Sequence, residues 1–113
     1  MTISTHVLDT ARGCPAAGLP IELSIQDTDG QWRRLGGGIT NDDGRVLTLL
    51  PPGQDLGPGI YRMRFECGVY HQSLGITGFY PLVDVRFQVL DADQHYHVPL
   101  LISPFGYSTY RGS

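Results

Sequence analysis

Short segments in which apolar and polar residues alternate recur along the chain, and this pattern constrains the fold more than any other feature. The alternation is clear at residues 20–27, 59–67 and 83–89. A period of two places successive side chains on opposite faces of a strand, so each segment has one face to bury. Turn signals rich in Gly, Pro, Asn and Asp separate the segments at intervals of roughly ten residues. The sequence therefore predicts an all-β, antiparallel β-sandwich of seven or eight strands.

Weaker segments complete this prediction. Further strands are expected at residues 31–35, 45–50, 95–102 and 107–111. Three consecutive glycines at 36–38 indicate a bulge or a close backbone approach. Residues 69–74 lose the period of two and are expected to form one short helix. With 113 residues, 41% of them hydrophobic, the chain 1–113 is expected to be a single domain with one core.

Charge and composition exclude several classes of function. The formal net charge is −3 and all eight basic residues are Arg, so no basic cluster is available for a run of phosphates. The absence of Lys also excludes Schiff-base chemistry and a P-loop. Apolar stretches are too short to cross a bilayer, and the first residues have no signal-peptide pattern. We therefore expect a cytoplasmic protein that binds neither nucleic acid nor membrane, with Cys14 and Cys67 as free thiols.

Two histidines are not explained by packing. In the segment 95–102 the period of two places His95 and His97 on the same face. Three interpretations remain open: a solvated polar face, a metal site that would need a third ligand from elsewhere, or acid–base chemistry by neutral imidazole. No Gly-x-Ser-x-Gly elbow surrounds Ser108, and Cys67 continues an apolar strand face, so covalent catalysis is disfavoured. Water-mediated chemistry by His and Arg remains, with Arg45 and Arg111 as candidate electrophilic partners.

Motifs at both ends of the chain resemble those of the transthyretin-like family. Near the start these are His-Val-Leu-Asp at 6–9 and Gly-Cys-Pro-Ala at 13–16. Near the end they are His-Tyr-His-Val-Pro-Leu-Leu at 95–101 and Ser-Pro-Phe-Gly-Tyr-Ser-Thr-Tyr at 103–110. The closing Tyr-Arg-Gly-Ser at 110–113 is similar to the tetrapeptide that separates the family's 5-hydroxyisourate hydrolases from its hormone carriers. The resemblance spans essentially the whole chain, apart from details such as Leu82, where the family often has an acidic residue.

The resemblance implies an eight-stranded sandwich with one short helix, assembled as a homotetramer whose central channel holds the sites. Residues on the family's catalytic positions are His6, Arg45, His97 and Ser113. The residues implied to shape the substrate pocket are Tyr110, Arg111 and Gly112. His95 matches a frequent family residue without a catalytic role, and His71, which matches no motif, is expected at the surface.

The activity implied by the resemblance is hydrolysis of 5-hydroxyisourate to 2-oxo-4-hydroxy-4-carboxy-5-ureidoimidazoline in urate breakdown. Neither cofactor nor metal is implied, because the strained acyl carbon of this substrate needs no Lewis acid. Two alternatives come from other classes of protein. One is a carrier that binds a small aromatic ligand in the same channel without turning it over. The other is a metal-dependent enzyme that uses His95 and His97 as ligands.

Overall fold

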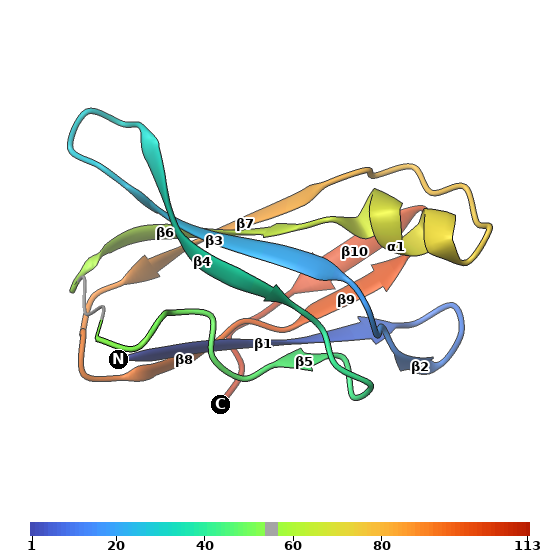
Figure 1. Cartoon of the computed structure of the whole chain (residues 1–113), viewed down its shortest axis with the longest axis horizontal. Coiled ribbons are helices and arrows are strands. Elements are labelled where there is room, and N and C mark those ends of the chain that lie inside the picture. The colour runs from blue at the N-terminus through green and yellow to red at the C-terminus, as the bar shows by residue number, and fades with distance from the viewer. Residues whose placement is uncertain (54–56) are drawn as a thin grey trace.

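The computed structural model describes residues 1–53 and 57–113 and has the predicted sandwich architecture (Figure 1). Its elements in chain order are β1 (Thr2–Asp9), β2 (Cys14–Pro15), β3 (Pro20–Gln26), β4 (Trp32–Ile39), β5 (Arg45–Val46), β6 (Gly59–Phe65), α1 (Cys67–Ser73), β7 (Val83–Val89), β8 (His95–His97), β9 (Leu100–Ser103) and β10 (Gly106–Thr109). Within the described residues, no helix is long and apolar enough to span a membrane.

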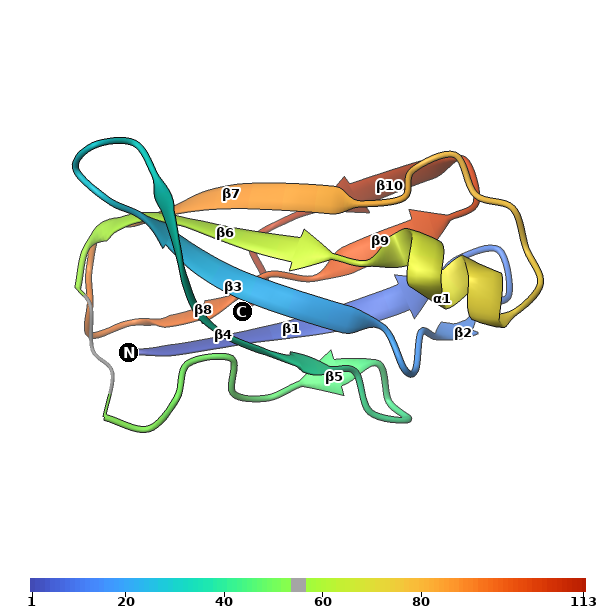
Figure 2. The ribbon, with the colours of Figure 1, turned by 45° about the horizontal axis from the view of Figure 1, so that its top comes forward.

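Two sheets form the layers of the sandwich. One has the strand order β4-β3-β6-β7 and is antiparallel throughout (Figure 2). The other has the order β10-β9-β1-β2, and β5 and β8 also pair with β1. The two inner faces are apolar, and their fully buried side chains include Ile3, Val7, Leu23, Tyr61, Met63, Phe65 and Leu100. The period of two in the sequence therefore corresponds to the alternation between this core and the outer faces.

Strand β1 was not predicted, yet it is the central strand of its sheet. Its inward-facing positions include Thr5 and Asp9, and these polar residues mask the alternation. Both are buried with hydrogen-bond partners. The Thr5 hydroxyl donates to the Val98 carbonyl at 2.6 Å, and the Tyr70 hydroxyl donates to Asp9 Oδ2 at 2.8 Å. The pairing of β1 with β8 and β9 is parallel, so the sandwich is antiparallel in most of its pairs but not in all.

Other predicted elements are confirmed with changed bounds. The helix begins at Cys67, and the bulge lies between β3 and β4, where the register shifts between Leu23 and Ser24. The segment 95–102 is divided into β8 and β9 around Pro99, which has no backbone N–H to donate to a ladder. The strand predicted at residues 45–50 is shorter in the structure: β5 ends at Val46, and the side chains of Leu49 and Leu50 are buried in the core.

His71 was predicted at the surface, and this prediction is wrong. Its side chain is only 2% exposed, on the face of α1 that packs toward the body of the protein. The sequence could not show this because α1 is short and has no clear amphipathic period. The loop after α1 covers the ring: a Cβ on Gly78 would lie 2.8 Å from His71 Nδ1. Glycine at position 78 therefore allows the loop to approach His71 closely.

Thr40 connects the end of β4 to the loop before β3, and its substitution tests how much this connection stabilises the fold. The buried hydroxyl donates to the Ala16 carbonyl at 2.6 Å and accepts from the Leu19 backbone N–H at 2.9 Å. Thr40→Val leaves both backbone groups without this partner, so we expect the free energy of unfolding to fall by about 1–3 kcal/mol. Urea denaturation measures this change. Thr40→Ser keeps the hydroxyl and is the control; equal loss in both variants would contradict the assignment.

Candidate active site

His6 and Arg45 lie opposite each other on neighbouring strands. β1 and β5 are antiparallel, and their register pairs His6 with Arg45. Directly opposed residues share a face of a sheet and have Cβ atoms roughly 5 Å apart. The shared face is the outer one, because the intervening β1 residues Thr5 and Val7 point into the core. An imidazole and a guanidinium are therefore adjacent on the outer surface of this sheet.

The turn before β5 determines where Arg45 lies. Asn41 Oδ1 accepts hydrogen bonds from the backbone N–H groups of Asp43 and Arg45 at 3.0 and 2.9 Å. Gly44 has a φ of +74°, and a Cβ there would lie 2.4 Å from the Val7 carbonyl oxygen. The Gly44 carbonyl accepts from the Val7 N–H at 2.7 Å, which fixes the turn against β1. The Asn-Asp-Asp-Gly turn predicted from sequence thus brings the guanidinium beside β1.

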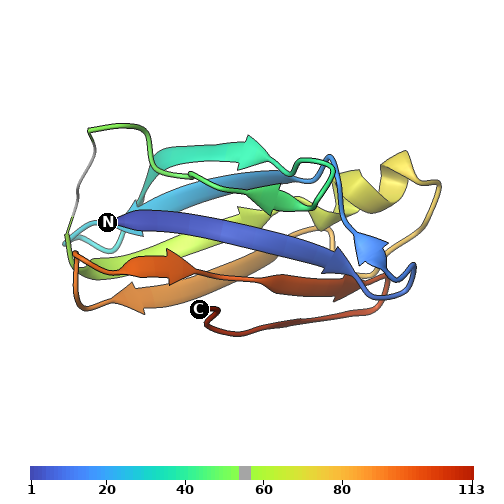
Figure 3. The same cartoon turned by 90° about the horizontal axis from the view of Figure 1, so that it is seen from below.

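His97 joins this face from the other side of β1. In Figure 3 the orange strand β8 runs alongside the blue strand β1. The parallel register pairs Ser4 with His97 and Thr2 with His95, so both histidines share the outer face with His6. Ser4 Oγ lies 2.8 Å from His97 Nδ1 and 3.2 Å from His95 Nε2. The two rings are nearly parallel, at 15°, with their centroids 6.3 Å apart. Three imidazoles and one guanidinium are thereby gathered across β5, β1 and β8.

The C-terminal segment closes against His97. Gly112 forms a backbone bridge to His97, and its N–H donates to the His97 carbonyl at 2.8 Å. A Cβ at position 112 would lie 2.4 Å from His97 Cδ2, so only glycine allows the chain this close to the ring. Ser113 follows Gly112 directly and is exposed at the end of this segment. Three of the four residues predicted as catalytic, His6, Arg45 and His97, therefore share one outer face within a single chain.

The surroundings of His97 favour its neutral form. Burial lowers the pKa of His97 below its ordinary value of 6.5, and the positive charge of Arg45 lowers it further. His95 and His6 add smaller effects of the same sign when they carry a proton. Because a proton acceptor must be neutral to work, His97 remains competent at a lower pH than an unperturbed histidine. This is the electrostatic setting that a general base requires.

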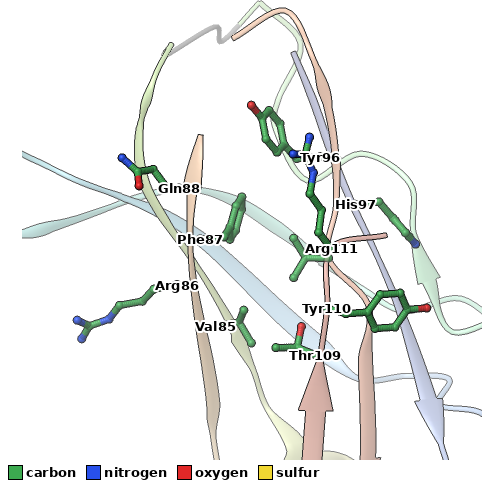
Figure 4. Close-up of a pocket in the computed structure, with 10 residues that line it drawn as sticks. Val85, Arg86, Phe87, Gln88, Tyr96, His97, Thr109, Tyr110 and Arg111 are labelled. Carbon is green, nitrogen blue, oxygen red and sulfur yellow. The ribbon is translucent and has the colours of Figure 1, made fainter. Parts of the chain in front are cut away.

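The pocket-shaping residues predicted from the family divide between two sides of the sheet. A cavity of about 320 Å³ lies between β7 and the C-terminal segment, lined by Phe87, Tyr96, Tyr110 and Arg111 among others. In Figure 4 the rings of His97 and Tyr110 point away from the Phe87 side, whereas Arg111 runs toward Tyr96. The Arg111 guanidinium lies 4.9 Å from the centre of the Tyr96 ring and donates to Gln94 Oε1 at 2.9 Å. Arg111 thus holds the C-terminal segment in place. His97 also contributes to the cavity lining, whereas His6 and Arg45 are not among its lining residues and lie on the outer face of the sheet.

The described residues include no candidate metal site, and the buried thiol of Cys67 is not suited to act as a nucleophile. Among residues 1–53 and 57–113, no three His, Cys, Asp or Glu side chains are grouped closely enough to hold a metal ion. Both cysteines are free thiols, as predicted. Burial raises the pKa of Cys67 to about 12, with a further contribution from Glu66. Such a thiol is not ionised near neutral pH, so Cys67 is a structural residue.

Comparison with known sequences places this geometry in a family. A profile of the HIUase/Transthyretin family matches residues 3–112. The chain belongs to this family. The sequence is 47% identical to a probable 5-hydroxyisourate hydrolase of Caenorhabditis elegans over 112 residues, which are 99% of this chain and 82% of that protein. It is 46% identical to a 5-hydroxyisourate hydrolase of Pseudomonas aeruginosa, over 98% of this chain and 90% of that one.

Solved structures of the HIUase/Transthyretin family confirm the fold. A 5-hydroxyisourate hydrolase of Klebsiella pneumoniae superposes with a TM-score of 0.86 at 34% identity, over the whole of both chains. Sea bream transthyretin, solved in complex with thyroxine, gives a TM-score of 0.91 at 29% identity, over 99% of this chain and 95% of that one. The backbone is thus shared by proteins with different functions, so the function of this family member must be argued from its side chains.

Ser4 belongs to this site although it was absent from the predicted site residues. The signal was present in the sequence, since Ser4 lies two residues before His6 and a strand would place both on one face. This spacing indicates a shared face only if residues 2–9 form a strand, which the alternation did not predict. Thr2, which contacts His95 Nδ1, extends the same row of outward-facing polar side chains along β1.

Gly112→Ala tests the close approach of the C-terminal segment to His97. The added methyl group would overlap His97 Cδ2, so we expect the segment and the ring to separate. Chemical shifts of the His97 ring protons, measured by NMR, would change in this variant. Gly106→Ala is the matched control, because its Cβ would meet only Ser103 Oγ at 3.6 Å. Unchanged His97 shifts in Gly112→Ala would show that the contact does not constrain the ring.

Arg45→Gln tests the electrostatic coupling between Arg45 and His97. Removing the positive charge takes away an effect that lowers the pKa of His97, so we expect that pKa to rise toward the ordinary value of 6.5. An NMR titration of the His97 ring follows the change directly. Arg33→Gln, which removes an arginine paired with Asp27 at 3.3 Å, is the charge-matched control. A downward shift, or the same shift in both variants, would contradict the coupling.

Proposed function

We propose that this protein hydrolyses 5-hydroxyisourate to 2-oxo-4-hydroxy-4-carboxy-5-ureidoimidazoline, a step of urate breakdown, by attack of a water molecule that His and Arg side chains assist. The observation that carries the proposal is the meeting of His6, Arg45 and His97 on one outer face, in a chain similar to 5-hydroxyisourate hydrolases over nearly its whole length. The site contains proton acceptors and a fixed cation, which are the two requirements of acyl hydrolysis by water.

His6 and His97 orient and deprotonate the attacking water. One imidazole accepts a proton from water as the oxygen forms its bond to the ring acyl carbon of the substrate. His97 is suited to this step because its pKa lies below the ordinary value, so the neutral form is already present near neutral pH. His6, diagonal to it on β1, holds the water or shares the proton.

Arg45 stabilises the negative charge that develops on the substrate. As water adds, the carbonyl oxygen becomes an oxyanion, and a guanidinium fixed beside His6 donates hydrogen bonds to it. The tetrahedral intermediate then collapses: the ring C–N bond breaks, and the departing nitrogen takes up the proton held by the imidazole. The product is a ring-opened carboxylic acid, and no cofactor or metal is needed to balance the reaction.

The C-terminal residues confine the substrate. Ser113 follows Gly112, whose backbone bridges to His97, and we assign its hydroxyl the role of anchoring the substrate or the attacking water. Tyr110, which is 59% exposed, points to the same side as His97 and forms part of the wall. Arg111 acts indirectly, because its guanidinium is engaged with Tyr96 and Gln94 and holds the segment in place.

The open face on which these groups lie supports an assembly of several copies. Arg45 and Tyr110 are exposed in the single chain, and a heterocycle bound there would be covered on one side only. A second copy facing this sheet would exclude water from the oxyanion and so strengthen its interaction with Arg45. We therefore propose the homotetramer of the family resemblance, with the sites in a channel between facing sheets.

The direct test generates 5-hydroxyisourate from urate with uricase and follows its ultraviolet decay. We expect wild-type protein to accelerate this decay, and His97→Asn and Arg45→Glu each to lower kcat by roughly two orders of magnitude, because each removes a group required in the transition state. Light scattering checks that the variants keep the mass of the wild-type assembly.

A wild-type rate no faster than the buffer blank would contradict the hydrolase and favour a carrier, the activity indicated by the thyroxine complex of sea bream transthyretin. Full activity in either variant would remove that residue from the mechanism. Stoichiometric bound zinc together with loss of activity on addition of a chelator would favour the metal-dependent alternative, in which His95 and His97 are ligands.

A further inference from the structure

We infer that Ser4 is a positioning residue that fixes the tautomer of His97, with His95 and Thr2 completing a hydrogen-bonded row that sets the direction of the Ser4 hydroxyl. This inference rests on the proposed function for its catalytic consequence, but the hydrogen-bonded row itself can be tested without any substrate.

The distances define the row. Ser4 Oγ lies between two imidazoles, 2.8 Å from His97 Nδ1 and 3.2 Å from His95 Nε2. His95 Nδ1 in turn contacts Thr2 Oγ1. The parallel pairing of β1 and β8 sets this spacing, because Thr2 lies opposite His95 and Ser4 opposite His97. Ser4 is only 6% exposed, so its hydroxyl has little access to other partners.

One hydroxyl between two imidazoles forces a choice of direction. Ser4 has a single proton, so it can donate to one ring and must accept from the other. If it accepts from His97 Nδ1–H, its own proton points to His95 Nε2. His95 then carries its proton on Nδ1 and donates it to Thr2. In this arrangement His97 Nε2 has no proton and presents a lone pair.

The chemistry of the site selects this direction. When His97 takes a proton from water it becomes a cation with N–H groups at both nitrogens, and its Nδ1–H then needs an acceptor. Ser4 already accepts there in the resting state, so no hydroxyl has to turn during the reaction. The opposite direction would place the neutral His97 proton on Nε2 and leave that nitrogen unable to accept another. Among residues 1–53 and 57–113, Ser4 Oγ is the hydrogen-bond partner of His97 Nδ1, and no second acceptor lies at that nitrogen.

The tautomer is measured directly by long-range ¹H–¹⁵N correlation of the histidine rings in the intact protein. We expect wild-type His97 to carry its proton on Nδ1 with Nε2 unprotonated. In Ser4→Ala the Nδ1–H loses its acceptor, so we expect the proton to move toward Nε2, where solvent can accept it. A wild-type His97 protonated on Nε2, or an unchanged tautomer in Ser4→Ala, would overturn the inference.

Kinetics provide the second measurement. A wrong histidine tautomer costs a serine protease about 10⁴-fold in kcat, but a neutral imidazole without a fixed partner can still exchange tautomers, so we expect roughly a ten- to a hundredfold loss of kcat in Ser4→Ala. KM should change little, because Ser4 is buried behind the His97 ring and is not exposed to the substrate. Ser4→Thr keeps the hydroxyl and should recover much of the loss. His95→Ala, at an exposed position that does not threaten folding, should give a smaller loss of kcat in the same direction.

Ser24→Ala is the matched control, since Ser24 is a buried serine on the outer face of the other sheet and 2% exposed. It should leave the His97 tautomer and kcat unchanged, and a loss equal to that of Ser4→Ala would mean that the effect is one of folding. The two proposals fail separately. Wild-type protein without hydrolase activity contradicts the function, whereas full activity of Ser4→Ala with an unchanged tautomer contradicts only the role of Ser4.

Discussion

The structure depends on the pairing of β1 with strands on both of its sides. β5 pairs antiparallel on one side, and β8 and then β9 pair parallel on the other. Backbone hydrogen bonds across these ladders fix the register, and the register decides which side chains are neighbours. A slip of one residue in β1 would turn His6 and Ser4 into the core and Thr5 and Val7 to solvent. The hydrophobic core and the candidate site therefore stabilise the same register.

Strand β1 keeps this register although two of its core-facing residues, Thr5 and Asp9, are polar. Thr5 and Asp9 are buried, but the Val98 carbonyl and the Tyr70 hydroxyl satisfy them. The bond from Tyr70 also ties α1 to the end of β1, and Arg12 extends it by donating to the Tyr70 hydroxyl at 3.2 Å. Burying Thr5 and Asp9 costs little free energy because both side chains have hydrogen-bond partners. These hydrogen bonds also hold the strand that carries His6 and Ser4.

The C-terminal segment is also held in place by specific contacts, but by fewer of them. One backbone bridge to His97 and the stacking of Arg111 on Tyr96 hold a segment whose residues are mostly exposed. Glycine at position 112 brings the backbone against the imidazole, so the ring is packed on one side and open on the other. The partial burial of the ring lowers the pKa of His97, while the ring keeps one side open to solvent.

The sequence by itself determined the sandwich, most strands, the single short helix and the Asn-Asp-Asp-Gly turn, because alternation and turn chemistry are local properties of the chain. The family resemblance also indicated His6, Arg45, His97 and Ser113, and the structure brings the first three of these residues onto one outer face. Only the tertiary structure showed β1 as the central strand, the burial of His71, the outward direction of the site and the place of Ser4 between two imidazoles. Apart from the burial of His71, these features come from the pairing of strands far apart in the sequence, 93 positions for Ser4 and His97, and no local pattern encodes such a register.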